Sequence, residues 1–323
     1  MGAPDCLRQS GAPATYLMAA PSTRVPQTSL AKRIGRDAPL GYALLIPLML
    51  VAFGLLMYPI ANAFGISLQD RMLGVQGPFI GLGNYIELLT DDRRFRTVVT
   101  NSLVFTLASV TGKIVFGMVM ALILNQRIRF RGMFRGWLLF PWVAPTFVTA
   151  LTWRWMYDGT AGVINYVLLN LKLIDVPIAW LAESATALGA VVATNIWRGF
   201  PFFGVALLAA MQAIPADLYE AADVDGATAL QKFLNVTLPG IRTTLAVTAM
   251  LSTIWTFNDF QIVFLMTGGG PAYATHLFAT YAYKVGFEGS RIGYATAISF
   301  LLAPVLIVMI MALSPLIMRS ENE

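Results

Sequence analysis

The stretch IPADLYEAADVDGATALQKFLNVTLP, residues 214–239, is the most polar long insertion between apolar segments in the second half of the chain. Pro215 can open a helix, because its missing N–H falls where a helix start has no partner. Gly226 can take the left-handed conformation that closes a helix. A second short helix is expected over 227–234, and Pro239 is expected to stop it. The stretch therefore predicts a helix, a glycine turn and a second helix.

The composition on either side of this stretch is that of a membrane protein. The 323 residues are 57% hydrophobic and 12% charged, with a mean hydropathy of +0.67, whereas soluble domains carry about 25% charged residues. The net charge of +5 does not indicate a nucleic-acid partner, because the basic residues are not gathered on one compact face. One cysteine and one histidine exclude an internal disulfide and a Cys/His metal cluster.

Six apolar stretches are long enough, near 20 residues, to cross a bilayer as helices. They cover residues 40–64, 99–124, 136–157, 187–210, 243–265 and 292–317. Prolines inside them are tolerated where neighbouring helices satisfy the freed backbone, which favours packed and kinked helices. The predicted fold class is therefore an all-α membrane protein with six transmembrane helices.

The Lys and Arg residues outside the spans predict the orientation. With the N-terminus inside, twelve of them lie on the cytoplasmic side and seven on the other, as the positive-inside rule favours. Both termini are then cytoplasmic, and so is the 214–239 loop. Residues 1–37 lack a continuous apolar core and a cleavage site, so we expect a flexible cytoplasmic tail and no cleaved signal peptide.

Three segments are expected on the outer side. The first holds a short surface helix over 79–89. The second, 163–181, is apolar but interrupted by polar residues and Pro177, so interfacial helices are preferred to a seventh span. The third starts with TGGGP at 267–271, which is expected to be a flexible loop.

The 214–239 stretch resembles the cytoplasmic signature of permease subunits of binding-protein-dependent ABC importers. That signature reads EAA, three residues, Gly, nine residues, Ile, one residue and Leu-Pro, with Val here in the place of Ile. Further landmarks, WRGFPF (197–202), NDF (258–260), TGGGP (267–271) and GYATAISF (293–300), are similar to those of maltose-type sugar permeases. The resemblance covers about residues 40–317.

The resemblance implies a type I ABC importer permease fold in the bacterial cytoplasmic (inner) membrane. The expected function is translocation of a carbohydrate or polyol that an extracytoplasmic solute-binding protein delivers. Expected partners are a second homologous permease and two ATPase subunits, which bind ATP and Mg²⁺; this chain is not an enzyme and binds no cofactor. Residues 38–98 would hold the first span and an outward segment, and 99–323 the permease core with the coupling loop. The expected ATPase-contacting residues are Glu220, Ala221, Ala222, Asp225, Gly226, Val236, Leu238 and Pro239.

Polar and aromatic residues in the fourth and fifth spans are candidates for the substrate pathway. A charge at mid-membrane is costly and usually faces a pathway, and aromatic faces beside hydrogen-bonding groups suit a polyhydroxylated solute. Inter-helix hydrogen bonding and an Arg198–Asp259 ion pair are the structural alternatives. Lys113 in the second span is expected to pair with a carboxylate or a neighbouring subunit. The candidates are Asn195, Trp197, Arg198, Phe202, Trp255, Asn258, Asp259 and Gln261.

Other functions remain as alternatives. The sequence lacks a phosphate-binding loop, a catalytic Ser/His/Asp set and a metal-ligand cluster. An ABC importer permease for another small solute, such as glycerol phosphate or a sulfated sugar, would have the same signature. A stand-alone secondary carrier should have coupling-ion carboxylates at mid-span, where Asp259 is the clear candidate, and it would leave the signature unexplained, as would a membrane-bound enzyme.

Overall fold

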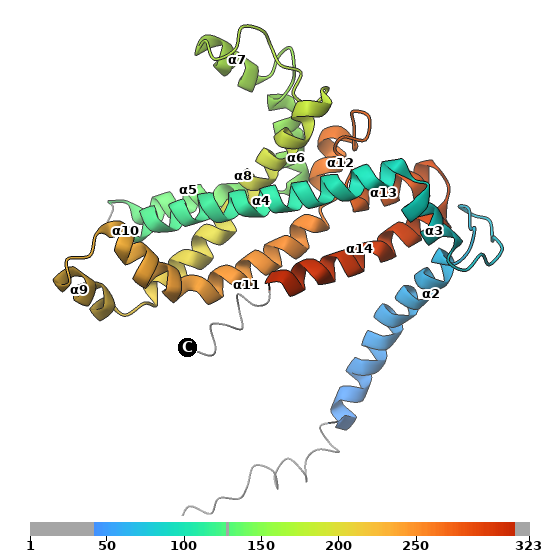
Figure 1. The fold of residues 1–323 in the computed structure, drawn as a ribbon, viewed down its shortest axis with the longest axis horizontal. Helices are drawn as coiled ribbons and strands as arrows, with labels where there is room; N and C mark the ends of the chain where they lie inside the picture. Colours follow the sequence, from blue (N-terminus) through green and yellow to red (C-terminus); the bar gives the residue numbers. More distant parts are fainter. Residues whose placement is uncertain (1–41, 127–128, 314–323) are drawn as a thin grey trace, which may run out of the picture. The chain divides into compact units, whose positions relative to one another are not determined.

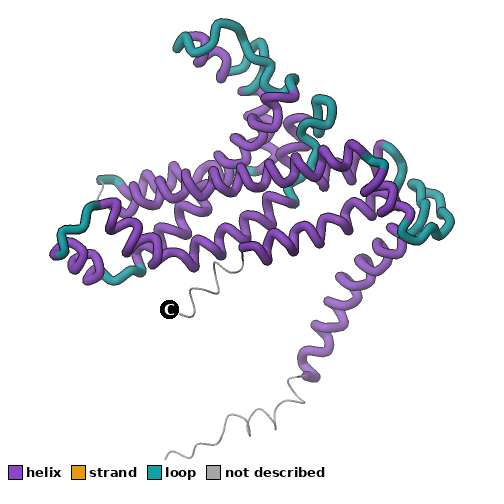
Figure 2. The backbone as a smooth tube through the Cα atoms, viewed as in Figure 1, coloured by secondary structure: helices purple, strands orange, loops and turns teal. Residues whose placement is uncertain are grey.

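The computed structural model describes residues 42–126 and 129–313, and all of the regular structure in these ranges is helical (Figures 1 and 2). The predicted tail, 1–37, lies outside the described residues. The chain divides into two compact units, residues 1–59 and 60–323. The described part of the first unit, residues 42–59, is helical and exposes its apolar side chains.

The helices of the described residues vary widely in length. Their bounds are α2 Tyr58–Ser67, α3 Gly83–Thr90, α4 Arg93–Asn125, α5 Arg131–Val143, α6 Thr146–Met156, α7 Val163–Asn170, α8 Ser184–Gln212, α9 Ala216–Val224, α10 Ala229–Lys232, α11 Leu238–Phe257, α12 Gln261–Thr267, α13 Phe278–Tyr283 and α14 Ile292–Leu313. Three π-helical turns lie at η1 Phe53–Met57, η2 Phe233–Thr237 and η3 Lys284–Glu288.

Within residues 42–126 and 129–313, four helices are long and apolar enough to cross a membrane, and they correspond to four of the six predicted spans. They are Tyr42–Ser67, Arg93–Asn125, Ser184–Gln212 and Ile292–Ala312. Apolar side chains surround α14. Only 17% of its most apolar 18-residue stretch is buried within this chain. A helix that is apolar on all sides is typical of a membrane-embedded segment. The protein is therefore an all-α membrane protein.

The two other predicted spans are each divided into two helices. Residues 136–157 form the end of α5 and the whole of α6, separated at Ala144 and Pro145, because a residue that precedes proline avoids the helical conformation. Residues 243–265 form most of α11 and part of α12, separated at 258–260. There the Asp259 carboxylate, one residue before the N-cap position Phe260, accepts a hydrogen bond from the Ile262 N–H in the first turn of α12.

Pro239 does not end a helix, contrary to the sequence prediction. The chain stays helical from α10 through η2 into α11, and Pro239 is the second residue of α11. The wider turn η2 precedes it, with the Leu238 N–H bonded to the Phe233 carbonyl. The same arrangement precedes Pro59, where the Tyr58 N–H bonds the Phe53 carbonyl. A π-helical turn therefore accommodates proline within a continuing helix at both places.

The packing of α4 against α8 is the most extensive helix contact, and glycines make it possible. A Cβ atom at Gly117 would lie 2.4 Å from Phe203 Cβ and 2.9 Å from the Phe200 carbonyl. A Cβ atom at Gly204 would lie 2.4 Å from Met120 Sδ. Small residues let membrane helices approach closely where no hydrophobic effect drives them together. The sequence therefore fixes the α4–α8 distance through its glycines.

Three apolar clusters hold the described helices of the second unit together. One joins α4, α8 and α11 around Phe203; a second joins α3, α4, α11, α13 and α14 around Phe278; and a third joins α4, α6, α8 and α12 around Phe105. In Figure 1, α4 accordingly runs beside α8, with one end near α10 and the other near α13.

The three segments that the sequence predicts to lie on the outer side differ in part from their predictions. The predicted surface helix over 79–89 forms as α3, but its Leu88 is fully buried. Residues 163–181 contain only α7, of 8 residues, so no seventh span forms there. Asn165, which is 2% exposed, closes this loop through the Ile178 backbone and the Trp180 indole. The segment after α12, expected to be flexible, is a closely hydrogen-bonded turn in which Thr275 Oγ1 donates to the Gly270 carbonyl at 2.7 Å.

Candidate functional site

The glycine turn of the 214–239 loop ends α9 in a Schellman motif. The Ala227 N–H donates to the Ala222 carbonyl at 2.9 Å, and the Gly226 N–H donates to the Asp223 carbonyl at 3.1 Å. Gly226 has φ +72° and no atom within 4 Å of the place where a Cβ would be. The glycine is therefore needed for its backbone conformation and not for space. The predicted helix–turn–helix is present, with α9 starting at Ala216, one residue after Pro215.

Two side-chain contacts fix α9 to the segment that follows it. Lys232 Nζ lies 2.6 Å from Asp223 Oδ1, and the Tyr219 hydroxyl lies 3.0 Å from Thr237 Oγ1. Thr228 and Gln231 form a reciprocal capping box at α10. These two contacts of α9 join it to the segment that leads into α11.

The surface of this loop is apolar with acidic residues around it. Its exposed apolar side chains are Leu218, Val224, Leu230 and Leu234. Glu220, Ala221 and Asp225 are exposed as well, as is Pro239, whereas Ala222, Val236 and Leu238 are half-buried. A groove of about 460 Å³ runs beside α9 and is lined by Ile214, Pro215, Leu218, Val236 and Pro239 among others. Exposed apolar patches with a polar rim mark contact surfaces for other proteins.

A second candidate site is a small cavity between α4, α8 and α11, within the predicted spans. Its volume is about 70 Å³, and its lining includes Asn195, Arg198, Phe202, Trp255 and Asp259. The structure thus brings together five of the eight predicted pathway residues. The other five lining residues, which the prediction did not place there, are Lys113, Trp142, Gly199, Ser252 and Thr256.

The polar groups of this cavity are joined by two hydrogen bonds. Asn195 Nδ2 donates to Asp259 Oδ2 at 2.9 Å, and Lys113 Nζ donates to Thr256 Oγ1 at 2.8 Å. Asn195 Oδ1 and Arg198 Nε are buried without a partner. No ion pair between Arg198 and Asp259 is found among residues 42–126 and 129–313, so the structural alternative for Arg198 does not have that form.

Aromatic rings form one wall of the cavity. The Phe202 ring stacks on Trp142, with centroids 6.1 Å apart, and lies 5.2 Å from the Trp255 ring. Both tryptophans are about half exposed, so the wall extends past the cavity to the surface of this chain. Stacked rings beside donors and acceptors can bind a sugar face and its hydroxyl groups.

Three predicted pathway residues lie away from the cavity. The Trp197 ring packs on Trp153, with centroids 5.4 Å apart. Asn258 is exposed and donates to the Ile254 carbonyl of its own helix, and Gln261 is exposed at the start of α12. Residues adjacent in sequence diverge here because α11 ends at Phe257. Lys113, which the sequence analysis identifies as a charge within the second span, has its Nζ hydrogen-bonded to the Thr256 hydroxyl in this chain and not to a carboxylate.

The match to a known family covers most of the chain. The family described as the binding-protein-dependent transport system inner membrane component matches residues 113–318. The chain belongs to this family. It is therefore a membrane-embedded ABC importer permease subunit without enzymatic activity of its own, as the sequence resemblance predicts.

Individual relatives support the same assignment for this permease. The trehalose/maltose transport system permease protein MalF of Thermococcus litoralis is 38% identical over 268 residues, which are 82% of this chain and 89% of that protein. The sulfoquinovosyl glycerol transport system permease protein SmoG of Agrobacterium fabrum is 32% identical, over 81% of this chain and 85% of that protein. The crystal structure of a bacterial ABC transporter involved in the import of the acidic polysaccharide alginate matches with a TM-score of 0.75 and 25% identity, over 90% of this chain and 98% of that one.

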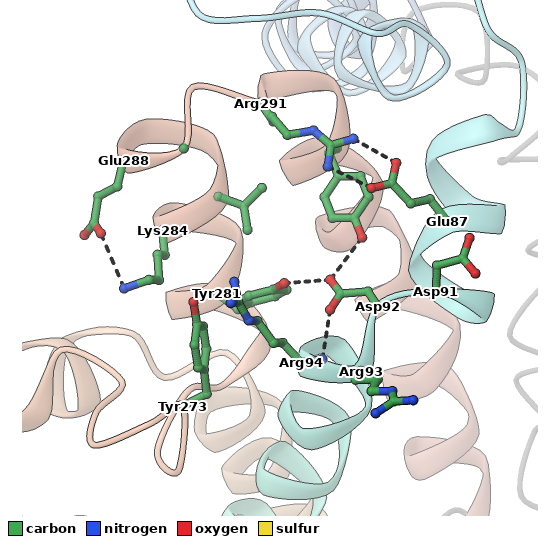
Figure 3. Close-up of a pocket in the computed structure, with 13 residues that line it drawn as sticks. Glu87, Asp91, Asp92, Arg93, Arg94, Tyr273, Tyr281, Lys284, Glu288 and Arg291 are labelled. Atoms are coloured by element: carbon green, nitrogen blue, oxygen red, sulfur yellow. Dashed lines mark hydrogen bonds and ion pairs between the residues drawn. The ribbon is translucent and has the colours of Figure 1, made fainter.

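The permease has a larger cavity at the N-terminal end of α4, beside α13 and α14 (Figure 3). Its volume is about 690 Å³, and charged residues and tyrosines line it. Asp92 is at its centre, where Oδ1 accepts the backbone N–H groups of Arg94 and Phe95, and Oδ2 accepts the hydroxyls of Tyr281 and Tyr294. Because one carboxylate bonds three helices, its role here is structural.

An ion pair closes one side of this cavity. Arg291 donates two hydrogen bonds of 2.8 Å to Glu87, one to each carboxylate oxygen. This bonding lowers the pKa of Glu87 below its usual value, against a smaller opposing effect of burial. Burial and the neighbouring Asp92 raise the pKa of Tyr281, so its hydroxyl stays protonated and donates. Residues 42–126 and 129–313 contain no group of three or more His, Cys, Asp or Glu side chains that could hold a metal ion.

Proposed function

We propose that this permease translocates a carbohydrate that an extracytoplasmic binding protein delivers, driven by ATP hydrolysis on separate subunits. The observation that carries the proposal is the cavity wall of Trp142, Phe202 and Trp255 beside unpartnered polar atoms at the centre of the predicted spans. The named cargoes of two relatives, trehalose/maltose and sulfoquinovosyl glycerol, support the carbohydrate class.

The proposal includes the partners and the arrangement in the membrane. A second homologous permease completes the pathway, and two ATPase subunits, which bind ATP and Mg²⁺, contact the cytoplasmic loop 214–239. If α5–α6 and α11–α12 each cross as an interrupted helix, the chain crosses a bacterial inner membrane six times. Both termini then lie in the cytoplasm. A periplasmic protein in complex with the alginate transporter supports the binding-protein partner.

The loop 214–239 gives a mechanism for coupling. The Lys232–Asp223 and Tyr219–Thr237 contacts link α9 to the start of α11, and α11 leads directly to Trp255 and Thr256 in the cavity. Movement of the ATPase subunits against α9 would therefore shift the cavity wall. A rigid helix that connects two sites is a physical route for such coupling.

Purification from the native host tests the proposal. We expect ATPase subunits and a second permease to co-elute, and we expect loaded binding protein to stimulate ATP hydrolysis in the purified complex. Uptake that needs an ion gradient and no ATP would instead identify a secondary carrier. Titrating the cognate binding protein with sugars and with glycerol phosphate tests whether the cargo is a carbohydrate or another small solute.

A further inference from the structure

The cavity between α4, α8 and α11 carries more positive than negative charge. Of its lining residues, Lys113 and Arg198 are cationic and Asp259 is anionic. Charged side chains are rare within membrane spans and usually pair with one another or face a pathway. The two cations and one carboxylate of this cavity do not balance.

The lysine is built into the helix packing. Lys113 is 6% exposed, and its Nζ reaches across to Thr256 of α11. Its side chain passes so close to α8 that a Cβ atom at Gly199 would lie 2.4 Å from Lys113 Cε. Gly199 therefore leaves the space through which the ammonium group reaches the cavity.

The single carboxylate is already engaged. Asp259 Oδ2 accepts from Asn195, and Oδ1 accepts from the Ile262 N–H. Arg198 Nε, in contrast, is buried with no hydrogen-bond partner. A buried charged donor without a partner is costly, and a ligand anion would remove that cost.

The size of the cavity indicates which part of a solute it can hold. About 70 Å³ is the space of two or three water molecules, which suits an acid group but not a whole sugar ring. The sugar ring would lie beyond the cavity, against the exposed faces of Trp142 and Trp255.

We propose that this cavity selects acidic saccharides, with the carboxylate or sulfonate of the solute beside Lys113 and Arg198 and its ring on the aromatic wall. This inference rests on the proposed function, because it names the solute class of the same pathway. A carboxylate of the second permease is the other group that could balance the charge, and the experiment below separates the two.

The test uses the whole transporter, with its ATPase subunits and binding protein, in proteoliposomes. The probes are matched neutral and acidic sugars: glucose and glucuronate, galactose and galacturonate, their disaccharides, and a hexose 6-sulfonate. We expect ATP-dependent uptake of at least one acidic probe, at least about tenfold faster than uptake of its neutral counterpart. ATP-dependent uptake of neutral sugars alone overturns the inference and leaves the proposed function intact. Uptake without ATP overturns the proposed function itself.

Variants of the permease then connect selectivity to the cavity. Arg198→Gln and Lys113→Gln should each lower uptake of the acidic probe by roughly ten- to a hundredfold. Arg198→Lys keeps the charge and should retain most of the uptake. Arg154→Gln, which removes an exposed arginine outside the cavity, is the matched control and should behave as wild type.

The yield of assembled complex decides between ligand and partner. Wild-type yield with lost acidic uptake in Arg198→Gln supports the proposal. The proposal is overturned if Arg198→Gln loses complex yield and an amide substitution of a partner carboxylate restores it. It is likewise overturned if both glutamine variants transport the acidic probe normally.

Discussion

At the residue scale, Gly226 is the one residue of the 214–239 loop that has a positive φ. Gly226 has φ +72° and open space around it, so only the backbone conformation resists a side chain. A non-glycine residue in that conformation costs roughly 1–2 kcal/mol, and a β-branched residue costs more. We expect Gly226→Val to keep normal insertion but to lose stimulation of ATP hydrolysis by loaded binding protein.

Glu220→Gln and Gly226→Ala are the matched comparisons for this prediction. Glu220 is exposed and keeps its shape as glutamine, so its loss of stimulation should be smaller than that of Gly226→Val. Gly226→Ala should be intermediate. Full stimulation in purified Gly226→Val complex would show that the left-handed turn does not matter for coupling.

His276 makes the stability of the permease dependent on pH. It is 3% exposed, its Nδ1 lies 3.2 Å from Thr280 Oγ1, and burial, with a smaller effect of Lys284, lowers its pKa from about 6.5 to about 4. Between these values the unfolded chain binds a proton that the folded protein does not. The contribution of uncharged His276 to the free energy of unfolding should therefore be complete above pH 6.5. It should fall, by up to about 1.4 kcal/mol per pH unit, as the pH drops toward 4.

Thermal unfolding of the purified protein at pH 7.5 and at pH 5 measures this effect. The His276→Gln variant lacks the titrating ring, so its transition temperature should change less between the two pH values. An equal change in the wild type and in His276→Gln would assign the pH dependence to other groups, such as Glu87.

At the element scale, Asp92 holds α4 to α13 and α14. Its carboxylate accepts two backbone N–H bonds of α4 and the hydroxyls of Tyr281 and Tyr294, at 2.6 and 3.0 Å. We expect Asp92→Ala to lower the free energy of unfolding by about 2–4 kcal/mol, since it removes a helix cap and two charge-assisted bonds. Denaturation of the purified protein measures the change.

Two further substitutions separate the bonds of Asp92. Asp92→Asn keeps an oxygen for capping but weakens the tyrosine bonds, so its cost should be intermediate. Asp91→Ala changes the neighbouring exposed carboxylate and should cost less than 0.5 kcal/mol, as is usual for surface positions. Equal stability of Asp92→Ala and Asp91→Ala would contradict the structural role of Asp92.

The sequence predicts which segments are helical better than it predicts where helices are interrupted. Apolar length identified α4, α8 and α14 because a bilayer demands it. The divisions at Ala144–Pro145 and at 258–260 were missed, since hydropathy is insensitive to backbone conformation. Pro239 was misread because a π-helical turn, which depends on the packing around it, lets the helix continue.

The residues of the cavity can be predicted from the sequence only in part, because contacts between helices that are far apart in the sequence decide which side chains line it. Arg198 and Asp259 stood out as charges within spans, and both line the cavity. Trp197 is predicted as an aromatic face of the pathway in the fourth span, but its place on α8 turns it toward Trp153. Lys113 joins the site because Gly199, on a helix far away in sequence, leaves room for it, and no local pattern carries that information.

At the scale of the whole molecule, the single native cysteine makes the membrane topology testable. Cys6 is the one cysteine in the chain, so the native protein already has a reporter in the predicted cytoplasmic tail. Ala161 and Ala229 are exposed; Ala161 precedes and Ala229 follows α8, the candidate span Ser184–Gln212, in the sequence. In a Cys6→Ser background, Ala161→Cys and Ala229→Cys therefore report the two ends of that span separately.

We expect a membrane-impermeant maleimide to label Ala161→Cys in intact cells, and to label Ala229→Cys and native Cys6 only in inverted vesicles. The physical reason is that α8 is too apolar and too long to lie on one side of a bilayer, and that the basic residues favour the cytoplasm for the 214–239 loop. Labelling in detergent controls for access of the reagent to each cysteine. Labelling of Ala161→Cys and Ala229→Cys from the same side would remove α8 as a span. Labelling of Cys6 opposite to Ala229→Cys would instead leave an odd number of crossings before the loop, and the interrupted pair α5–α6 would then be the segment that does not cross.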